Sequence, residues 1–391
     1  MRTIALGMLL GMAPTGNAAL AQPDGAYLRV VDVGNGLCVI ARTPDGRVML
    51  FDAGDWKYPG RVSGQGYCIA ALDEIAPHRP LDLVVLSHSD GDHIGELGYI
   101  LKRGALEIFH PGDAHRPNPD ATLIKQARNA IDHSGAVVHD LRKLQGDRFT
   151  LSGPGQYAEQ AGPNNIDAIR VVPLGDATVT LLAGWGDADW VVGPQEEKAG
   201  QDGQSRVRAA LEDGEHNNAV SLIVRFEYAG HSVLLTGDTV GRHIRDPRNA
   251  CKFAERITVA SANPALVDSD VLIGQHHGAD NASSQCFIEA VSPRYVVFSA
   301  GHKDYRHPRN SVIRRLLEAD LQPKLGPDNI LRTDRGDSEP PKGTTWGDQE
   351  WVYGSFKGCV DPIGDDDVEI LLPSDPAASV RVNYRVEKHS C

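Results

Sequence analysis

The sequence predicts an α/β protein in which two β-sheets pack face to face with helices outside, an αββα sandwich. Short apolar runs rich in Val, Ile and Leu alternate with helical segments in both halves of the chain. Gly34-Asn35-Gly36 and Pro44-Asp45-Gly46 separate the first runs and predict hairpins. With 391 residues, 41% of them hydrophobic, the chain has ample material for a core.

The individual elements follow from the hydrophobic pattern. In the first half we expect strands at 27–33, 37–41, 48–52, 81–86, 136–139, 169–172 and 179–182, and helices at 69–75, 94–103 and 121–134. In the second half we expect strands at 220–228, 231–235, 270–274 and 294–299, and a helix at 311–319. The same order of strands, loop and helix in both halves favours two similar layers.

The N-terminal residues 1–21 are predicted to be a signal peptide. An apolar stretch at 4–12 is followed by Ala19-Leu20-Ala21, a small-residue cleavage site before Gln22. No other apolar run approaches the roughly 20 residues that span a bilayer. We therefore expect a periplasmic or secreted protein without a membrane span once the signal is removed. All six cysteines follow Gln22, so disulfides are permitted, although the sequence cannot choose their pairing; Cys38 is expected in the core.

The rest of the chain divides into a core domain at 22–337 and a β-rich extension at 338–391. Within the core domain, residues 187–215 are polar, glycine-rich and acidic, and are interpreted as a surface insertion or lid. The extension has three expected strands, 350–356, 368–372 and 380–386, forming either an added β-layer or a small appended module. Asp365-Asp366-Asp367 lacks the spacing of a calcium loop and is expected to be a solvated acidic turn.

The loop after the strand at 81–86 concentrates metal-ligand side chains. His88, Asp90, Asp92 and His93 fall within six residues, with glycines among and after them. Such a loop can direct His88 and Asp90 at one point and Asp92 and His93 at a second point nearby. A mixed nitrogen and oxygen set serving two cations is the arrangement that clamps a bridging water. A polar surface turn is the alternative, but two imidazoles and two carboxylates at this density disfavour it.

Further candidate ligands follow later expected strands. Asp238 comes after the strand at 231–235, His276 and His277 after the strand at 270–274, and His307 after the strand at 294–299. Irregular backbone just past a strand can turn side chains into a shared cleft. One such residue would be an ordinary cap or turn, but the series predicts one composite site.

These motifs resemble the metallo-β-lactamase-fold hydrolases, most closely the metallohydrolase domain of the ComEC/Rec2 family of DNA-uptake proteins. The resemblance extends over residues 28–337, and its segments are Val31-Asp32-Val33-Gly34-Asn35-Gly36, Phe51-Asp52-Ala53-Gly54, His88 to Gly95, Asn217-Asn218-Ala219-Val220-Ser221-Leu222, Leu235-Thr236-Gly237-Asp238, His276-His277-Gly278, Tyr305-Arg306-His307-Pro308 and Arg332-Thr333-Asp334. Many enzymes of the fold carry His where Asp90 stands, whereas the ComEC-like branch carries Asp. ComEC proteins cross the membrane many times. This chain differs from them because it has no apolar run of sufficient length after its N-terminal stretch.

The resemblance implies two divalent cations, Zn²⁺ or Mn²⁺, with Asp238 bridging them. His88, Asp90 and His276 would complete one centre, Asp92 and His93 the other, and His277 would orient neighbouring ligands. Asp90 in place of His shifts the preference toward Mn²⁺ without excluding Zn²⁺. Whether His216, Asn218 or neither touches a metal stays open.

The expected function is an exported metal-dependent phosphodiesterase or nuclease. The cations would lower the pKa of a bound water so that hydroxide forms near neutral pH, with Asp92 assisting this nucleophile. His307 would protonate the leaving oxygen or hold a phosphate. The cluster Arg306, Arg309, Arg314 and Arg315 either binds a phosphate or forms a solvated helix face.

Two other functions remain candidates. The net charge of −13 repels nucleic acid in bulk and favours a small-molecule substrate, so hydrolysis of another ester, lactone or amide is the first alternative. A non-catalytic binding protein on the same fold is the second, and the intact ligand series counts against it.

Overall fold

Two mixed β-sheets lie at the centre of the molecule. The computed structural model describes residues 24–54, 66–111, 122–141, 170–183, 217–219, 221–242, 251–259, 264–301, 307–335 and 366–386. The first sheet has the order β15 (Arg381–Tyr384), β14 (Val368–Pro373), β1 (Gly25–Val30), β2 (Val39–Arg42), β3 (Val48–Phe51), β4 (Leu81–Val85), β5 (Ala105–His110) and β6 (Val137–Asp140). The second has the order β13 (Ile330–Arg332), β12 (Tyr295–Phe298), β11 (Val271–Ile273), β10 (His231–Leu235), β9 (Ile223–Tyr228), β8 (Ala177–Ala183) and β7 (Arg170–Leu174).

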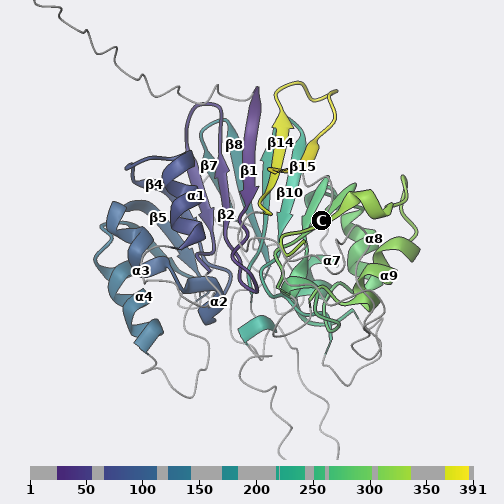
Figure 1. Ribbon diagram of the computed structural model, residues 1–391, viewed down its shortest axis with the longest axis horizontal. Helices are drawn as coiled ribbons and strands as arrows, with labels where there is room; N and C mark the ends of the chain where they lie inside the picture. The colour runs from purple at the N-terminus through teal and green to yellow at the C-terminus, as the bar shows by residue number, and fades with distance from the viewer. Residues whose placement is uncertain are drawn as a thin grey trace, which may run out of the picture.

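Helices flank the two sheets on opposite sides (Figure 1). Beside the first sheet lie α1 (Tyr67–Ile75), α2 (Gly91–Ile94), α3 (Leu97–Ile100) and α4 (Thr122–Asp132). Beside the second sheet lie α7 (Phe253–Val259), α8 (Gln285–Val291) and α9 (Asn310–Glu318). Short 3₁₀ turns occupy Leu101–Arg103, Pro264–Leu266, Gln275–Gly278 and Pro327–Asn329. The predicted αββα sandwich is confirmed.

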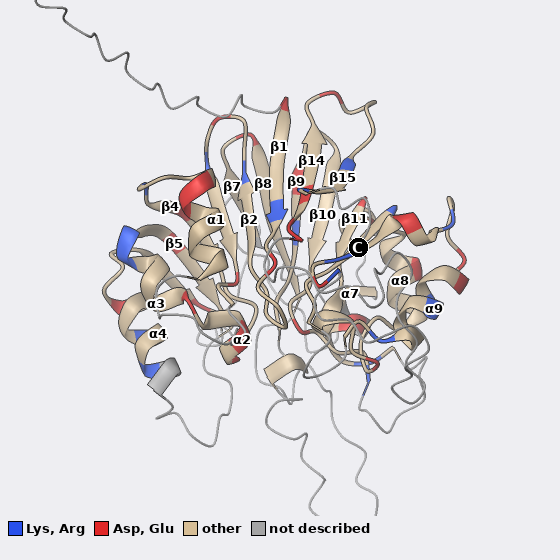
Figure 2. Cartoon of the chain, in the orientation of Figure 1, with Lys and Arg blue, Asp and Glu red and all other residues tan. Residues whose placement is uncertain are grey.

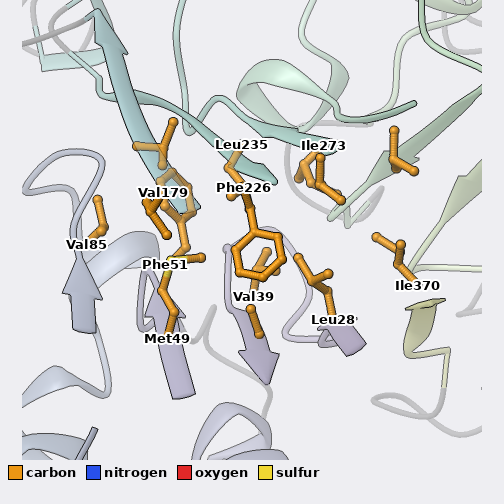
Figure 3. Close-up of a cluster of buried hydrophobic side chains, with 14 of the residues drawn as sticks. Leu28, Val39, Met49, Phe51, Val85, Val179, Phe226, Leu235, Ile273 and Ile370 are labelled. Carbon is orange, nitrogen blue, oxygen red and sulfur yellow. The ribbon is translucent and has the colours of Figure 1, made fainter. Parts of the chain in front are cut away.

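The main core lies between the facing surfaces of the two sheets. Along β1, Leu28 and Val30 point inward, while Tyr27 lies on the outer face beside α1, as the two-residue period of a strand requires. Figure 3 shows side chains of the first sheet, such as Phe51, meeting side chains of the second, such as Phe226. Two further apolar clusters fill the space between each sheet and its helices. Because both faces of these strands are buried, their sequences are near-continuous apolar runs.

The structure corrects one helix and adds elements that the hydrophobic pattern missed. The helix expected at 94–103 is wrong: two short helices and a 3₁₀ turn stand there, and the first begins at Gly91, inside the ligand loop. Gly95 and Gly98 weaken a continuous helix at these positions. Helices α7 and α8 and strands β5 and β13 were not predicted; α7 and α8 have 7 residues each and β13 has 3, which leaves little periodicity to detect.

The C-terminal strands complete the first sheet. Strand β14 pairs antiparallel with β1, placing Ile370 opposite Leu28, and β15 pairs with β14 at the sheet edge. The expected strand at 350–356 lies outside the described residues. The solvated turn predicted for Asp366 and Asp367 is wrong. Both side chains are buried: Asp366 pairs with Arg335 at 3.0 Å, and the Asp32 backbone N–H donates to Asp367 at 2.9 Å.

Two disulfides stabilise the two helical layers. Cys38, just before β2, bonds Cys68 in α1, and Cys251 before α7 bonds Cys286 in α8. Cys38 is fully buried, as expected. In the described part of the chain, no helix has the length and apolar character needed to cross a bilayer. The predicted signal peptide, the insertion at 187–215 and His216 lie outside the described residues.

Loss of either disulfide should lower the free energy of unfolding. The bonded cysteines are 30 and 35 residues apart in sequence. Loop-closure entropy for such separations predicts a loss of about 3–4 kcal/mol per bond. Denaturant unfolding of Cys38→Ala/Cys68→Ala and of Cys251→Ala/Cys286→Ala would measure each loss. Peptide mapping under non-reducing conditions is the control, and a different pairing would contradict the assignment.

Candidate metal centre

The predicted site residues gather at one end of the sandwich, beyond strands of both sheets. Asp52 follows β3 and the ligand loop follows β4, while Asp238 follows β10 and the His276–His277 turn follows β11. Both strand pairs run parallel, so the ends of neighbouring strands face the same way. In Figure 2 this end of the sandwich points down, and helix α2, which carries Asp92, lies there near acidic residues drawn in red.

Asp238 is the residue around which the others are arranged. Its Oδ1 lies 3.0 Å from Nε2 of His93 and 3.3 Å from Nε2 of His277. Its Oδ2 lies 3.7 Å from Nε2 of His276 and 4.0 Å from Nε2 of His88. Each oxygen of one carboxylate therefore faces a different pair of imidazoles, which is the geometry that a bridging ligand needs.

The other two predicted carboxylates lie on opposite sides of Asp238. Asp92 Oδ2 is 3.6 Å from Nε2 of His277, and Asp90 Oδ2 is 3.7 Å from Nε2 of His88. Atoms of one group lie within 4.8 Å of one another and could hold a metal ion: Asp92, His93, Asp238 and His277. His277, for which the sequence predicted only an orienting role, stands in this group, and His276 does not.

Hydrogen bonds on the far side of each ring set the histidine tautomers. His93 Nδ1 donates to Asp52 Oδ2 at 2.7 Å, and His277 Nδ1 donates to the Ser299 carbonyl at 2.7 Å. A carboxylate or carbonyl oxygen only accepts, so both Nδ1 atoms carry the hydrogen in the neutral rings. We infer from this network that both Nε2 atoms present lone pairs.

His88 is oriented in the same way through Ser87. The Ser87 hydroxyl donates to Asp52 Oδ2 at 2.6 Å, which leaves its oxygen free to accept from His88 Nδ1 at 2.9 Å. The Ser87 backbone N–H also donates to Asp52 Oδ1 at 2.6 Å. Asp52 thus orients His93 directly and His88 through one hydroxyl.

The resulting cluster has the donor set of a divalent-metal site. Nε2 of His88, His93 and His277 and Oδ1 of Asp238 are buried and make no hydrogen bond. Buried polar atoms in proteins are almost always partnered. Converging imidazole nitrogens and carboxylate oxygens are the ligands that Zn²⁺ and Mn²⁺ take, so these residues fit divalent cations.

The electrostatics of the cluster agree with this. Burial alone would raise the pKa of Asp238, but His277, His93 and His276 hold that pKa well below its usual range. Burial opposes protonation of His93, yet Asp238, Asp52 and Asp92 outweigh it and raise the His93 pKa well above its ordinary value. The cluster therefore requires positive charge, which either protons or cations can supply.

His276 and Asn218 contact each other beside this cluster. The Asn218 amide donates to His276 Nε2 at 3.1 Å, and His276 Nδ1 donates to Asn281 Oδ1 at 3.0 Å. His276 and His277 both adopt left-handed backbone, with φ of 47° and 55°. This conformation is uncommon outside glycine and turns the two adjacent rings to different sides of Asp238.

His307 lies next to the His276–His277 turn. Its ring centroid is 5.9 Å from that of His276 and 6.3 Å from that of His277. Burial, followed by the charges of His276, His277 and Arg309, lowers the pKa of His307 well below its usual range. Among the other arginines, Arg315 bonds Asp280 and nearby carbonyls and so has a structural role, and Arg306 lies outside the described residues.

The sequence analysis gave no role to Asp52 or to Asn217. Asn217 donates to Asp90 Oδ1 at 2.8 Å and so orients that predicted ligand. Asp52 follows a strand, as the predicted ligands do, and this signal could have identified it. Gly54, two residues on, allows close approach: a Cβ there would lie 1.9 Å from the Asp92 carbonyl oxygen.

A separate cavity of about 450 Å³ lies on the outer face of the first sheet, lined by residues of β1, β14, β15 and the end of α1. Its lining includes Arg29 and Glu74, which are paired at 3.0 Å. It shares no residue with the cluster around Asp238.

Comparison with known proteins identifies the family of this chain. The family model of the metallo-beta-lactamase superfamily matches residues 31–302. Competence protein ComA of Neisseria gonorrhoeae is 26% identical over 336 residues, covering 85% of this chain and 34% of the relative. ComE operon protein 3 of Bacillus subtilis (strain 168) is 22% identical over 319 residues, covering 78% of this chain and 31% of the relative. The chain thus spans about a third of the length of these relatives.

Among solved structures, the metallo-beta-lactamase fold protein YhfI from Bacillus subtilis aligns with a TM-score of 0.40 at 12% identity, covering 78% of this chain and 95% of that chain. The family match spans most of the chain, and motif residues of both sheets converge on Asp238. The chain therefore belongs to the metallo-beta-lactamase superfamily and has ComEC-like relatives at low identity.

Proposed function

We propose that the chain is a phosphodiesterase or nuclease that works with two divalent cations. The observation that carries the proposal is Asp238, whose two oxygens face different sets of unpartnered imidazole nitrogens. His88, Asp90 and Asp238 Oδ2 would hold one cation; Asp92, His93, His277 and Asp238 Oδ1 would hold the other. We add His277 to the second centre, and we leave His276, which the sequence predicted for the first centre, outside the ligand set because Asn218 already occupies its lone pair.

The cations would supply Lewis acidity for a water and for the oxygens of a phosphodiester. The protein's own contribution is orientation and charge. Asp52 and Ser299 fix the imidazoles of His93 and His277, so that little rearrangement is needed on binding. Asp92, whose side chain is 17% exposed, would accept a proton from a water at that side of the cluster.

His307 is proposed to hold the substrate by a hydrogen bond. A histidine whose pKa lies well below its usual range is neutral at pH 7 and is a poor proton donor. Cations bound nearby would lower that pKa further. Of the two roles that the sequence predicted, the structure therefore favours the anchor over the acid.

Hydrolysis of another ester, lactone or amide is the second candidate. The net charge of −13 favours it, because an acidic protein repels a polyanionic substrate. Turnover of bis(p-nitrophenyl) phosphate and single-stranded DNA, with and without Mn²⁺, tests the first candidate. Turnover of p-nitrophenyl acetate or a lactone without any phosphodiester cleavage would favour the second.

Asp238→Asn should lose metal. Wild type purified without chelator is expected to contain between one and two equivalents of Mn or Zn by elemental analysis. The Asn side chain keeps the shape but removes the negative charge that serves both cations, so its metal content should fall toward zero. His307→Ala is the control and should keep the wild-type content. Wild type without metal even after reconstitution would overturn the proposal.

His307→Ala should keep metal and lose turnover by about 10²-fold, the lower end of what one positioned catalytic group contributes. An anchor affects all substrates, so p-nitrophenolate and alkoxide leaving groups should suffer equally. Turnover of the wild type should also not fall between pH 6 and pH 8 on account of His307, because its neutral form predominates throughout. A selective loss on the alkoxide substrate would instead assign the acid role.

We also propose that the chain is exported, a location supported by the two disulfides among the described residues, because disulfides persist in oxidising compartments. Protein isolated from its native host should begin at or near Gln22 when analysed by mass spectrometry. Recovery of a chain that retains residues 1–21 and is fully reduced would show that the proposal is wrong.

A further inference from the structure

Glu255 is a buried carboxylate that contacts the segment carrying His276 and His277 without belonging to the metal cluster. It lies on α7 and is fully buried. Its Oε1 accepts hydrogen bonds from Gln275 Nε2 at 3.0 Å and from the Ser284 backbone N–H at 3.1 Å. A buried carboxylate in an apolar helical layer costs free energy, so its retention there calls for an explanation.

The segment that Glu255 holds is under backbone strain. His276 and His277 are consecutive non-glycine residues with positive φ. Such conformations persist only where the surrounding structure holds them, and they concentrate at functional sites. The His276 backbone N–H donates to the Gly237 carbonyl at 3.0 Å, which links this turn directly to the residue before Asp238.

Glu255 is bonded on both sides of that turn. Gln275 immediately precedes His276, and Ser284 lies three residues after Asn281, whose side chain orients the His276 ring. The Asn281 carbonyl accepts from the Gly241 N–H at 3.0 Å. A Cβ at Gly241 would lie 1.7 Å from Glu255 Oε2, so this carboxylate fills the space between the segment after β10 and the histidine turn.

We propose that Glu255 is a positioning residue for the metal centre, holding the His276–His277 turn in its strained conformation through Gln275 and Ser284. The proposal rests on the proposed function only in that the centre binds metal. The positioning depends on the two hydrogen bonds that Glu255 Oε1 accepts, and the charge of the buried carboxylate is secondary to them. The Cys251–Cys286 disulfide supports the same arrangement, because it fixes the segment before α7 to α8.

Two substitutions of Glu255 test the role of these hydrogen bonds, because one removes the acceptor oxygen and the other keeps it. Glu255→Ala leaves Gln275 Nε2 and the Ser284 N–H without their acceptor inside the protein, which favours movement of the turn. Glu255→Gln keeps an acceptor oxygen at the same place and should preserve the turn. Thr258→Ala is the matched control: Thr258 is equally buried on α7, but its hydroxyl donates only to the Ala254 carbonyl of the same helix.

The experiment measures two properties of folded protein, with folding checked by circular dichroism. In metal-free protein, amide hydrogen exchange at His276 and Ser284 should be faster in Glu255→Ala than in wild type, and unchanged in Thr258→Ala. Zn²⁺ and Mn²⁺ affinity, measured by chelator competition, should fall about 10–100-fold in Glu255→Ala, the effect of removing support from metal ligands. Glu255→Gln should stay within about threefold of wild type in both measurements.

The outcomes distinguish this inference from the proposed function. Exchange and affinity in Glu255→Ala that match wild type would overturn the inference, and so would equal changes in Thr258→Ala. If wild type binds neither metal, the proposed function fails, while the exchange measurement in metal-free protein still decides whether Glu255 holds the turn. If Glu255→Ala does not fold, Gln275→Ala replaces it, because that substitution removes the same hydrogen bond from its other end.

Discussion

The structure depends on one buried carboxylate, Asp238, and on the positive charge that it requires. An ionised carboxylate cannot be buried without partners, and Asp238 is buried with three histidines close enough to lower its pKa. Its oxygens are shared between two groups of imidazoles, so the site has two halves joined by one side chain. Hydrogen bonds from Asp52, Ser87 and Ser299 hold the imidazoles of both halves in place.

Bringing them together requires unusual backbone. Asp52, His276 and His277 all have positive φ, and Gly54 stands where the chain of α2 leaves no room for a Cβ. These residues lie just past strands β3 and β11, where the rigid sheets can hold strained loops in place. The packed core between the sheets therefore helps to hold the site in place, because it fixes the strand ends from which the loops start.

The C-terminal strands belong to the same structural unit. Strand β14 pairs along the whole of β1, and a buried network of Asp32, Asp366, Asp367 and Arg335 closes the junction. Strand β1 leads directly into the segment containing Asn35, whose Oδ1 accepts a hydrogen bond from the Gly301 N–H at 2.9 Å, two residues after Ser299. The first sheet is thus completed by the C-terminal residues on the side opposite β6.

The sequence by itself determined the αββα class, most of the strands and the residues from which the site is built. It could do so because buried strands are continuous apolar runs and ligand residues follow them closely in the chain. Only the tertiary structure decided how those residues are shared: His277 lies with Asp92 and His93, His276 faces the other oxygen of Asp238, and Asp52 orients two of the rings. Adjacent histidines are equivalent in sequence, and only the backbone conformation and the hydrogen bonds from distant segments distinguish their two rings. The same reason explains Asp366 and Asp367, which form an acidic turn by composition but are buried because Arg335 and the Asp32 backbone N–H, far away in sequence, meet them in space.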